Sequence, residues 1–439
     1  MKKIIKNETG SSDFPLATSP FKSKVAVKKN LSKKDYHCHL TMGASSKQIA
    51  LIIKNSDTHD FNQIKEKISK HSLRGIRLFI VVFLLHMPRI FINSVFILNV
   101  IIRFSGILRN WSTGNCYMVS KEILKETVKQ VSKNYLSDNV TSFSLRLNPF
   151  KENMYKKDTD IFSVFIETLS CIIESLDSVA KARGIDKNSL TVILSLNRDS
   201  GKKYLAYMKE INKRKPEIPK FIMDRIYGID LAGPEGNIDG ISVDDWVPVI
   251  LEFGKKFTPH VGDNRNLKKG TELYDLYQKY VQSKNENDLL FFLNKHADFV
   301  FDYVNSMEEG SEIAHGISIS KRQLLFRPDK NGNKELFVYE ITNQALLLKI
   351  EKMKEIIRLK KITICFCPST TIKSNSMENF SQLPIFEWIR EGIMVKIGVD
   401  GMFQSPSPKT LSSEMVKLAW IQPKYYEKLS EEEVNNLVN

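Results

Sequence analysis

The chain of 439 residues is poor in cysteine and histidine, with five Cys and eight His. The cysteines are an odd number and include no C-x-x-C pair, so we predict neither a disulfide framework nor a structural zinc ribbon. A reducing compartment such as the cytoplasm fits this pattern best. Glycine (20) and proline (15) are also scarce, and 42% of the residues are apolar, which excludes a collagen-like or low-complexity chain and indicates a globular protein.

Positive charge is in excess, but much of it lies in one segment. The formal net charge is +15, and residues 1–34 contain nine lysines against two acidic residues. We interpret 1–34 as a flexible basic arm, which either aids solubility or contacts phosphates or an anionic surface. Because the remaining chain is only modestly basic, we do not expect it to bind nucleic acid.

One long hydrophobic segment raises the question of membrane association. Residues 76–104 are mostly apolar but are interrupted by Pro88 and Arg89. A membrane-spanning helix requires about 20 predominantly apolar residues, and an arginine at its centre costs several kcal/mol. We therefore interpret 70–118 as an apolar helical insertion of two buried helices that meet near Pro88. Membrane association through 76–104 is the less favoured alternative.

Short β-branched or apolar runs that end in polar residues or glycine alternate with helical patterns along the chain. The runs predict eight strands, at 35–39, 140–146, 190–196, 225–231, 256–260, 311–315, 361–367 and 394–400. The helical patterns include 120–135, 161–183, 273–280, 289–307 and 344–359. This alternation predicts an α/β protein, a (β/α)8 TIM-type barrel over 35–425 with the helical insertion after its first strand. Residues 426–439 are expected to form a polar tail.

Histidine is scarce, yet three of the eight predicted strands end on one. The first strand carries His37 and His39, the fifth ends at His260, the sixth at His315, and the eighth at Asp400. Residues i and i+2 of a strand point to the same side, so the first two imidazoles project together at the end where such barrels hold their catalytic residues. Imidazoles and a carboxylate suit zinc, and they also accept iron, cobalt or manganese. The sequence therefore predicts metal-assisted hydrolysis.

Seven short motifs, read in order, resemble those of the adenosine and AMP deaminase family. They are HCHL at 37–40, SLRLNP at 144–149, GIDLAGPE at 228–235, HVGD at 260–263, AHG at 314–316, CPST at 367–370 and GVD at 398–400. The resemblance implies a (β/α)8 barrel that binds one Zn²⁺ per chain. It also implies hydrolytic deamination of an adenine nucleoside or nucleotide to a 6-oxopurine and ammonia. The small deaminases with a cysteine-rich zinc site are a different class, because this chain has no C-x-x-C.

The resemblance also implies a role for each matched residue at the strand ends. His37, His39 and His260 match the histidine ligands of the metal, and His39 also lies where the substrate binds. Asp400 matches the carboxylate ligand that takes a proton from the attacking water. His315 matches the histidine that orients this water and stabilises its charge; the alternative for His315 is a buried histidine of the core.

Two further matched residues face the purine ring. Gly233 matches the glycine whose backbone N–H contacts the ring, although a simple turn at the end of a strand also explains it. Asp263 occupies the position of the glutamate that protonates the ring nitrogen, and its side chain is one methylene shorter. A displacement of about 1 Å can cost on the order of 100-fold in rate. Arg146 and Arg198 are predicted to make structural ion pairs.

Two other departures concern substrate recognition. Gly401 replaces a second aspartate that contacts the far edge of the purine in the family, and residues 40–43 lack the acid that holds a ribose hydroxyl. Adenosine itself is therefore not assured as the substrate. A phosphorylated substrate is compatible with the basic residues Arg265, Lys268 and Lys269. The alternative is a weakened or inactive barrel that acts as a purine-binding or interaction protein.

Overall fold

The computed structural model describes residues 32–40, 48, 52, 120–150, 159–264, 266–328, 334–372, 381–400, 410–421, 423 and 427–439. The predicted arm up to residue 31, the insertion at 70–118, Arg265 and Gly401 lie outside the described residues. Among those that are described, no helix is long and apolar enough to cross a membrane.

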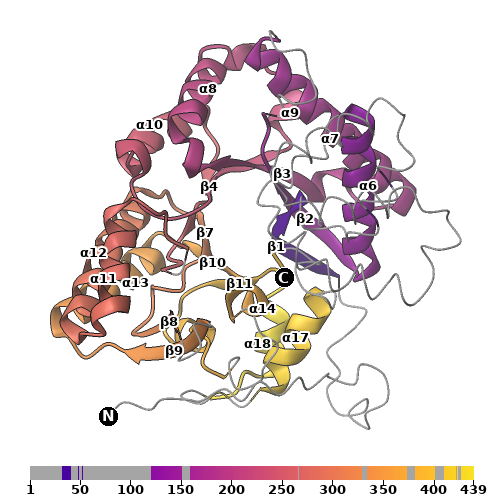
Figure 1. Cartoon of the computed structure of the whole chain (residues 1–439). Helices are drawn as coiled ribbons and strands as arrows, with labels where there is room; N and C mark the ends of the chain where they lie inside the picture. The colour runs from indigo at the N-terminus through magenta and orange to yellow at the C-terminus, as the bar shows by residue number, and fades with distance from the viewer. Residues whose placement is uncertain are drawn as a thin grey trace, which may run out of the picture.

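Parallel strands form a barrel at the positions that the sequence predicts (Figure 1). One sheet contains, in order, β1 (Lys33–His39), β2 (Val140–Leu147), β3 (Leu190–Asn197), β4 (Ile226–Ala232) and β5 (Lys256–Phe257). The other contains, in order, β11 (Val395–Ile397), β10 (Thr363–Phe366), β7 (Glu312–His315) and β6 (His260–Val261). The fifth predicted strand is divided into β5 and β6, so all eight predicted strands are confirmed.

Hydrogen bonds close both seams between the two sheets. Pro259 separates β5 from β6, because it has no N–H to donate, but its carbonyl accepts a bond from Ala314 N at 2.9 Å. At the other seam, His39 N donates to Asp400 O and Asp400 N donates to His37 O, each at 2.9 Å. The second seam thus joins the first and last strands of the barrel directly at the candidate site.

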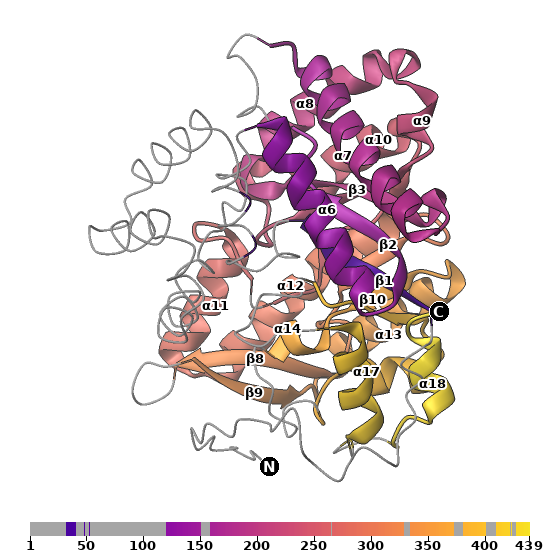
Figure 2. The ribbon, with the colours of Figure 1, turned by 90° about the vertical axis from the view of Figure 1, so that its right-hand side faces the viewer.

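Helices cover the outside of the barrel (Figures 1 and 2). They are α6 (Lys121–Ser137), α7 (Ile161–Arg183), α8 (Gly201–Lys213), α9 (Lys220–Met223), α10 (Val243–Phe253), α11 (Glu272–Ser283), α12 (Glu286–Ser306), α13 (Gln344–Leu359), α14 (Pro368–Ile372), α16 (Ile385–Arg390) and α17 (Leu411–Trp420). Local signals set the ends of α7, where the Asp160 carboxylate accepts a bond from Ser163 N at 3.1 Å and Gly184 adopts φ 65°. All five predicted helices are confirmed.

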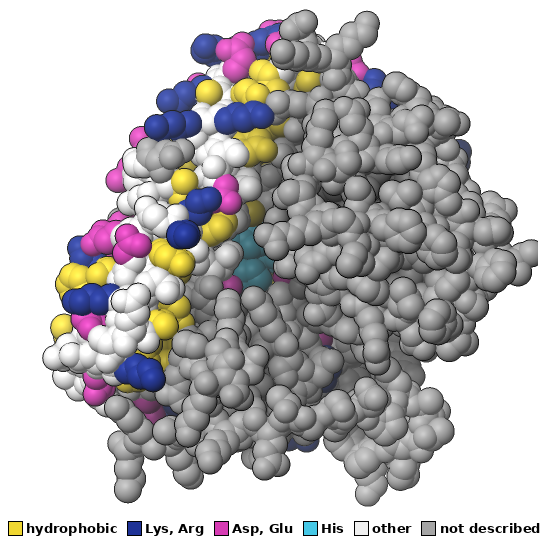
Figure 3. Space-filling model, in the orientation of Figure 1, with side chains coloured by type: hydrophobic (Ala, Val, Ile, Leu, Met, Phe, Trp, Pro, Cys, Tyr) yellow, Lys and Arg dark blue, Asp and Glu magenta, His cyan; other side chains and the backbone are white. Residues whose placement is uncertain are grey.

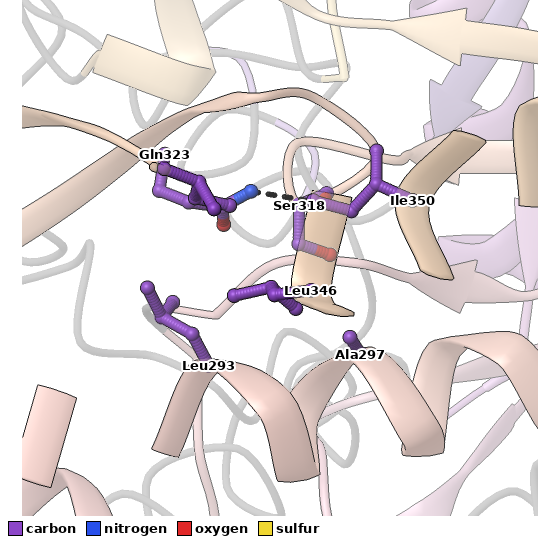
Figure 4. A pocket seen from close by; sticks show the side chains of 7 residues that line it. Leu293, Ala297, Ser318, Gln323, Leu346 and Ile350 are labelled. Atoms are coloured by element: carbon purple, nitrogen blue, oxygen red, sulfur yellow. Dashed lines mark hydrogen bonds between the residues drawn. The ribbon is translucent and has the colours of Figure 1, made fainter. Parts of the chain in front are cut away.

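An antiparallel hairpin that the sequence did not predict follows the sixth barrel strand. It pairs β8 (Arg322–Pro328) with β9 (Lys334–Glu340). Near its base, Gln323 points towards α12 and α13, and its side-chain amide donates to Ser318 O at 3.0 Å (Figure 4). The same side chain accepts a bond from Asn264 Nδ2 at 2.9 Å. The hairpin is therefore tied to the loop that follows β6.

The C-terminal residues do not form the polar tail that the sequence predicted for 426–439. The segment contains α18 (Glu431–Asn436), and Val434, Leu437 and Val438 are buried. Lys34 N donates to Val438 O at 2.8 Å, and Ile397 N donates to Leu437 O at 3.0 Å. The end of the chain therefore packs against β1 and β11, because apolar residues recur at helical spacing within the acidic stretch.

A buried ion cluster joins α13 to α16. Lys354 is fully buried, and its Nζ lies 2.6 Å from Glu387 Oε1 and 3.1 Å from the half-exposed Glu351. Glu387 also accepts bonds from Ser320 Oγ at 2.8 Å and Lys321 N at 3.0 Å. Burial alone would raise the pKa of Glu387, but Lys354 and these hydrogen bonds hold it below its ordinary value of 4.5. The charged form of Glu387 is therefore stabilised by folding.

We expect Glu387→Gln to lower the free energy of unfolding by about 3 kcal/mol at pH 7, because it removes the fully buried counter-charge of Lys354 and leaves only the more exposed Glu351 and Glu391, at 3.1 and 2.7 Å. Glu351→Gln is the matched control, with an expected change of about 0–1 kcal/mol. A depressed acid pKa contributes stability above pH 4.5 that is lost as the pH falls further, so the difference between Glu387→Gln and wild type should shrink at low pH. Urea unfolding of the wild type and both variants, at pH 7 and at a pH below 4.5, measures these free energies. Equal losses of unfolding free energy in Glu387→Gln and Glu351→Gln would contradict the prediction.

Candidate metal centre

The first strand places two imidazoles on the same side at the end of the barrel. His37 and His39 are two residues apart in β1, and their Nε2 atoms lie 3.1 Å from each other. His39 Nε2 also lies 3.1 Å from His260 Nε2, at the start of β6. These three ligand atoms all lie within 4.8 Å of one another, although the residues come from two distant parts of the sequence.

A buried carboxylate behind His260 fixes the orientation of that imidazole. Asp230 lies in β4, is fully buried, and holds its Oδ1 2.7 Å from His260 Nδ1. Burial alone would raise the pKa of Asp230, but His260 and Arg146 hold it well below its usual range. A carboxylate can only accept, so His260 Nδ1 carries the proton and its Nε2 presents a lone pair to the cluster.

The eighth strand supplies a carboxylate to the same cluster. Asp400 Oδ1 lies 3.4 Å from the Nε2 atoms of both His37 and His39. Asp400 has φ 62°, in the left-handed region that non-glycine residues rarely adopt. Gly398 allows the last strand to lie close to His37, because a Cβ at position 398 would be only 2.6 Å from His37 Cβ.

The donor set fits a divalent metal ion better than a hydrogen-bond network. His39 Nε2 carries either one proton or one lone pair, so it cannot make good hydrogen bonds to both neighbouring nitrogens. A cation accepts the lone pairs of all three imidazoles. Nitrogens bound tetrahedrally to zinc are about 3.3 Å apart, which is close to the observed 3.1 Å.

The protonation states also suit a metal site. Burial lowers the pKa of His39 to about 4, although the Asp400 charge opposes this, so its imidazole is neutral at physiological pH. Burial, reinforced by the charge of Arg146, holds the pKa of His37 well below its usual value. Burial opposes ionisation of Asp400, but its hydrogen bond to His37 and the nearby histidines keep its pKa well below the usual value. Metal ligands must be deprotonated in this way.

His315, at the end of β7, lies beside the three imidazoles. Its ring centroid lies 5.1 Å from that of His37 and 5.2 Å from that of His260. Like Asp400, it has a left-handed backbone, with φ 73°. His315 and Asp400 therefore both have an unfavourable backbone conformation, which the surrounding fold must hold in place.

The site can be reached from one face of the molecule. Figure 3 shows a histidine surface near the middle of that face. The side chains of His39 and His260 keep 14% and 13% of their surface exposed, whereas His37 is fully buried. Of the three clustered imidazoles, those of His39 and His260 are therefore the ones accessible to solvent.

Gly233 follows β4 with φ 95°, and a Cβ there would lie 2.5 Å from Asn197 Oδ1. Its carbonyl accepts a bond from Arg198 NH1 at 3.1 Å. Arg198 also donates to Tyr303 OH at 3.2 Å and to the His260 carbonyl, so it holds the ends of β4 and β6 together. The predicted structural ion pair is confirmed for Arg146, which lies 3.3 Å from the Asp230 carboxylate, whereas the Arg198 contacts described here are to neutral oxygens.

Two of the three predicted phosphate ligands, Lys268 and Lys269, lie in the part of the chain that the structure describes. Lys268 lies 2.9 Å from Asp199, in the loop after β3, and Lys269 is exposed. The positive charge of Lys268 is thus partly neutralised by the carboxylate of Asp199.

Sequence reasoning assigned no role to Asp230. Its signal was present in the sequence, since a carboxylate inside an apolar strand has to be paired when the strand is buried. Its partner His260 follows thirty residues later, and only the closed barrel brings the two together.

We expect Asp230→Asn to weaken zinc binding about 10- to 100-fold, because an amide no longer fixes the proton on His260 Nδ1. Ser195→Ala is the matched control, since Ser195 Oγ donates to the other Asp230 oxygen at 2.8 Å. Competition with a chromogenic chelator measures the zinc dissociation constant, and circular dichroism verifies folding. An unchanged constant in folded Asp230→Asn would contradict the assignment.

The fold defines the chain as an α/β protein built on a TIM-type barrel of parallel strands. No protein-family model matches the chain, and no curated protein matches its sequence. Solved structures do match, at 11–12% identity, so the likeness concerns the fold.

Three of these structures span nearly the whole chain. An Arabidopsis N6-methyl-AMP deaminase is 12% identical, with a TM-score of 0.50, and the match covers 93% of this chain and 92% of that one. An adenine deaminase from Arthrobacter aurescens is 11% identical, with a TM-score of 0.51 and coverage of 93% and 91%. An amidohydrolase with bound Zn from Burkholderia ambifaria is 12% identical, with a TM-score of 0.51 and coverage of 94% and 85%.

Proposed function

We propose that the chain is a zinc-dependent aminohydrolase that converts a 6-aminopurine nucleoside or nucleotide into the 6-oxopurine and ammonia. The observation that carries the proposal is the convergence of His37, His39, His260 and Asp400 at the carboxyl end of the barrel. This is where barrels of this kind carry their chemistry. The motif order of the sequence and the amidohydrolase fold support the same reaction class.

His37, His39, His260 and Asp400 would hold the ion, with Asp230 fixing the tautomer of His260. A divalent ion supplies a nucleophile at neutral pH, because it lowers the pKa of a water that it binds to about 7. The four side chains supply neutral imidazoles and a carboxylate, which is the ligand set that zinc prefers.

The remaining residues move protons and orient the substrate. Asp400 accepts a proton from the attacking water, and His315 holds that water by hydrogen bonding. Asp263, directly after the β6 loop glycine, donates a proton to the ring nitrogen next to the amine-bearing carbon. The amine takes up the proton that Asp400 accepted and leaves as ammonia, and loss of the hydroxyl proton, which returns the acid form of Asp263, gives the 6-oxopurine. Gly233 offers its backbone to the purine ring, since no Cβ prevents close approach.

We favour a nucleotide over adenosine as the substrate. The sequence lacks the acid that holds a ribose hydroxyl in adenosine deaminases, and one structural neighbour is an N6-methyl-AMP deaminase. The basic character of the chain is compatible with a phosphate.

The test is to incubate zinc-loaded protein with adenosine, AMP, N6-methyl-AMP, ATP, and guanine and pterin analogues. Release of ammonia or methylamine is measured. We expect turnover of at least one adenine nucleotide, and its loss after chelation with recovery on zinc addition. No release from any compound, with wild-type protein shown to contain metal, would overturn the proposal.

A second candidate is a barrel that binds purines without efficient deamination. Asp263 favours it, because its carboxylate is one methylene shorter than the glutamate of the resembled family. In that case calorimetry detects binding of a purine nucleotide by wild type, and only Asp263→Glu releases ammonia.

A further inference from the structure

One side chain from a neighbouring loop holds the backbone of Asp263. Glu235 follows β4, two residues after Gly233, and only 2% of its surface is exposed. Its Oε1 accepts a hydrogen bond from Asp263 N at 2.7 Å, and its Oε2 lies 2.8 Å from His296 Nε2. A buried carboxylate is costly unless it is paired, and here both oxygens are used.

The backbone of Glu235 binds the same loop. Glu235 N donates to Asn266 O at 2.6 Å, and Lys268 N donates to Glu235 O at 3.0 Å. Counting the side-chain contact, Glu235 makes three hydrogen bonds to the segment from Asp263 to Lys268. The position of this loop relative to β4 therefore depends on Glu235.

His296 fixes the far end of the Glu235 side chain. It lies on α12, is 1% exposed, and packs between Phe292 and Phe299, with ring centroids 5.8 and 6.3 Å away. Because a carboxylate only accepts, Nε2 of His296 must be the donor. A ring packed on both sides cannot follow the carboxylate if the loop shifts, so it acts as a fixed anchor.

The residues on either side of Asp263 are held from the opposite direction. Gly262 O accepts a bond from Ser318 N at 2.8 Å, and Asn264, fully buried, donates to Gln323 at 2.9 Å. These contacts come from the region after β7, whereas Glu235 comes from β4. The Asp263 backbone is thus fixed between two parts of the barrel.

We propose that Glu235 and His296 are positioning residues that set the reach of the Asp263 carboxylate towards the substrate. The inference rests on the proposed function, in which Asp263 is the proton donor. An aspartate has one fewer rotatable bond than a glutamate, so its carboxylate depends more closely on the position of its own backbone. The Glu235 and His296 pair fixes that backbone and makes a shorter acid usable.

The kinetic test is a double-mutant cycle between Glu235→Ala and Asp263→Glu. With Asp263 present, Glu235→Ala is expected to lower kcat about 100-fold and to change KM by less than about threefold. In the Asp263→Glu background, Glu235→Ala should lower kcat about tenfold or less, because the longer side chain of glutamate tolerates a displaced loop. Equal losses in both backgrounds would show that Glu235 does not act through Asp263 and would overturn the proposal.

Two further variants cover the case in which Glu235→Ala does not fold. Glu235→Gln keeps an oxygen for the Asp263 amide but loses the acceptor for His296 Nε2, so it should lower kcat about tenfold, less than Glu235→Ala does. His296→Phe suits the aromatic packing but removes the donor, and it should lower kcat about tenfold at an unchanged KM. If His296→Phe folds and keeps full kcat, the role assigned to His296 is wrong.

Hydrogen exchange separates this inference from the proposed function. In His296→Phe and Glu235→Ala, the amides of Asp263 and Lys268 should exchange at least about tenfold faster than in wild type. This readout needs no substrate, so it stands even if wild type releases no ammonia. Unchanged protection of the Asp263 amide in folded variants would overturn the positioning role.

Discussion

His260→Ala is expected to leave no deamination above the uncatalysed rate and to lose the bound metal. The side chain supplies a candidate ligand atom 3.1 Å from His39 Nε2 and is the hydrogen-bond partner of Asp230. Its removal therefore takes away one ligand and leaves a buried carboxylate without that partner. Metal content by atomic absorption, together with ammonia release, measures both effects.

A matched control for His260→Ala lies at the other end of the same predicted strand. Lys256 is exposed, and its Nζ donates to Gly310 O at 3.0 Å, so Lys256→Ala should keep both metal and activity. A folded His260→Ala protein that retains a full equivalent of metal would show that His260 is not a ligand.

Asp263→Asn should lower kcat about 10²- to 10⁴-fold, since an amide has no acidic proton to donate to the ring. The bound metal should remain, because Asp263 is not a member of the histidine cluster. Asp263→Glu restores an acid and is expected to stay within about tenfold of wild type. Steady-state kinetics with the nucleotide found in the substrate panel measures all three proteins.

The outcome that would contradict this assignment is an Asp263→Asn protein with wild-type kcat. Loss of metal in the same variant would instead give Asp263 a structural role near the site.

The parts of the site that carry local sequence signals could be predicted. His39 and His315 end β1 and β7, and His260 ends the predicted fifth strand although it begins β6 in the structure; a barrel brings the carboxyl ends of such strands together. Asp400 follows the same rule at the last strand. The sequence therefore contained enough information to predict the ligand cluster.

The residues behind the site could not be predicted, because their pairing depends on closure of the barrel. Glu235 and His296 are separated by 61 positions and belong to a loop and an outer helix. Neither has a spacing that indicates its partner. The hairpin of β8 and β9 was missed although its strands carry the apolar runs 324–326 and 336–339, because an antiparallel pair does not belong to the alternating strand and helix pattern of the barrel.

The contact between the first and last barrel strands has a consequence for folding. The bonds from Lys34 to Val438 and from Ile397 to Leu437 place the last residues against the first and last barrel strands. β1 has no neighbour on this side until Asp400 and the segment around Val438 dock against it. His37 and His39 therefore meet Asp400 only when the barrel closes, so the proposed ligand cluster forms together with the tertiary fold.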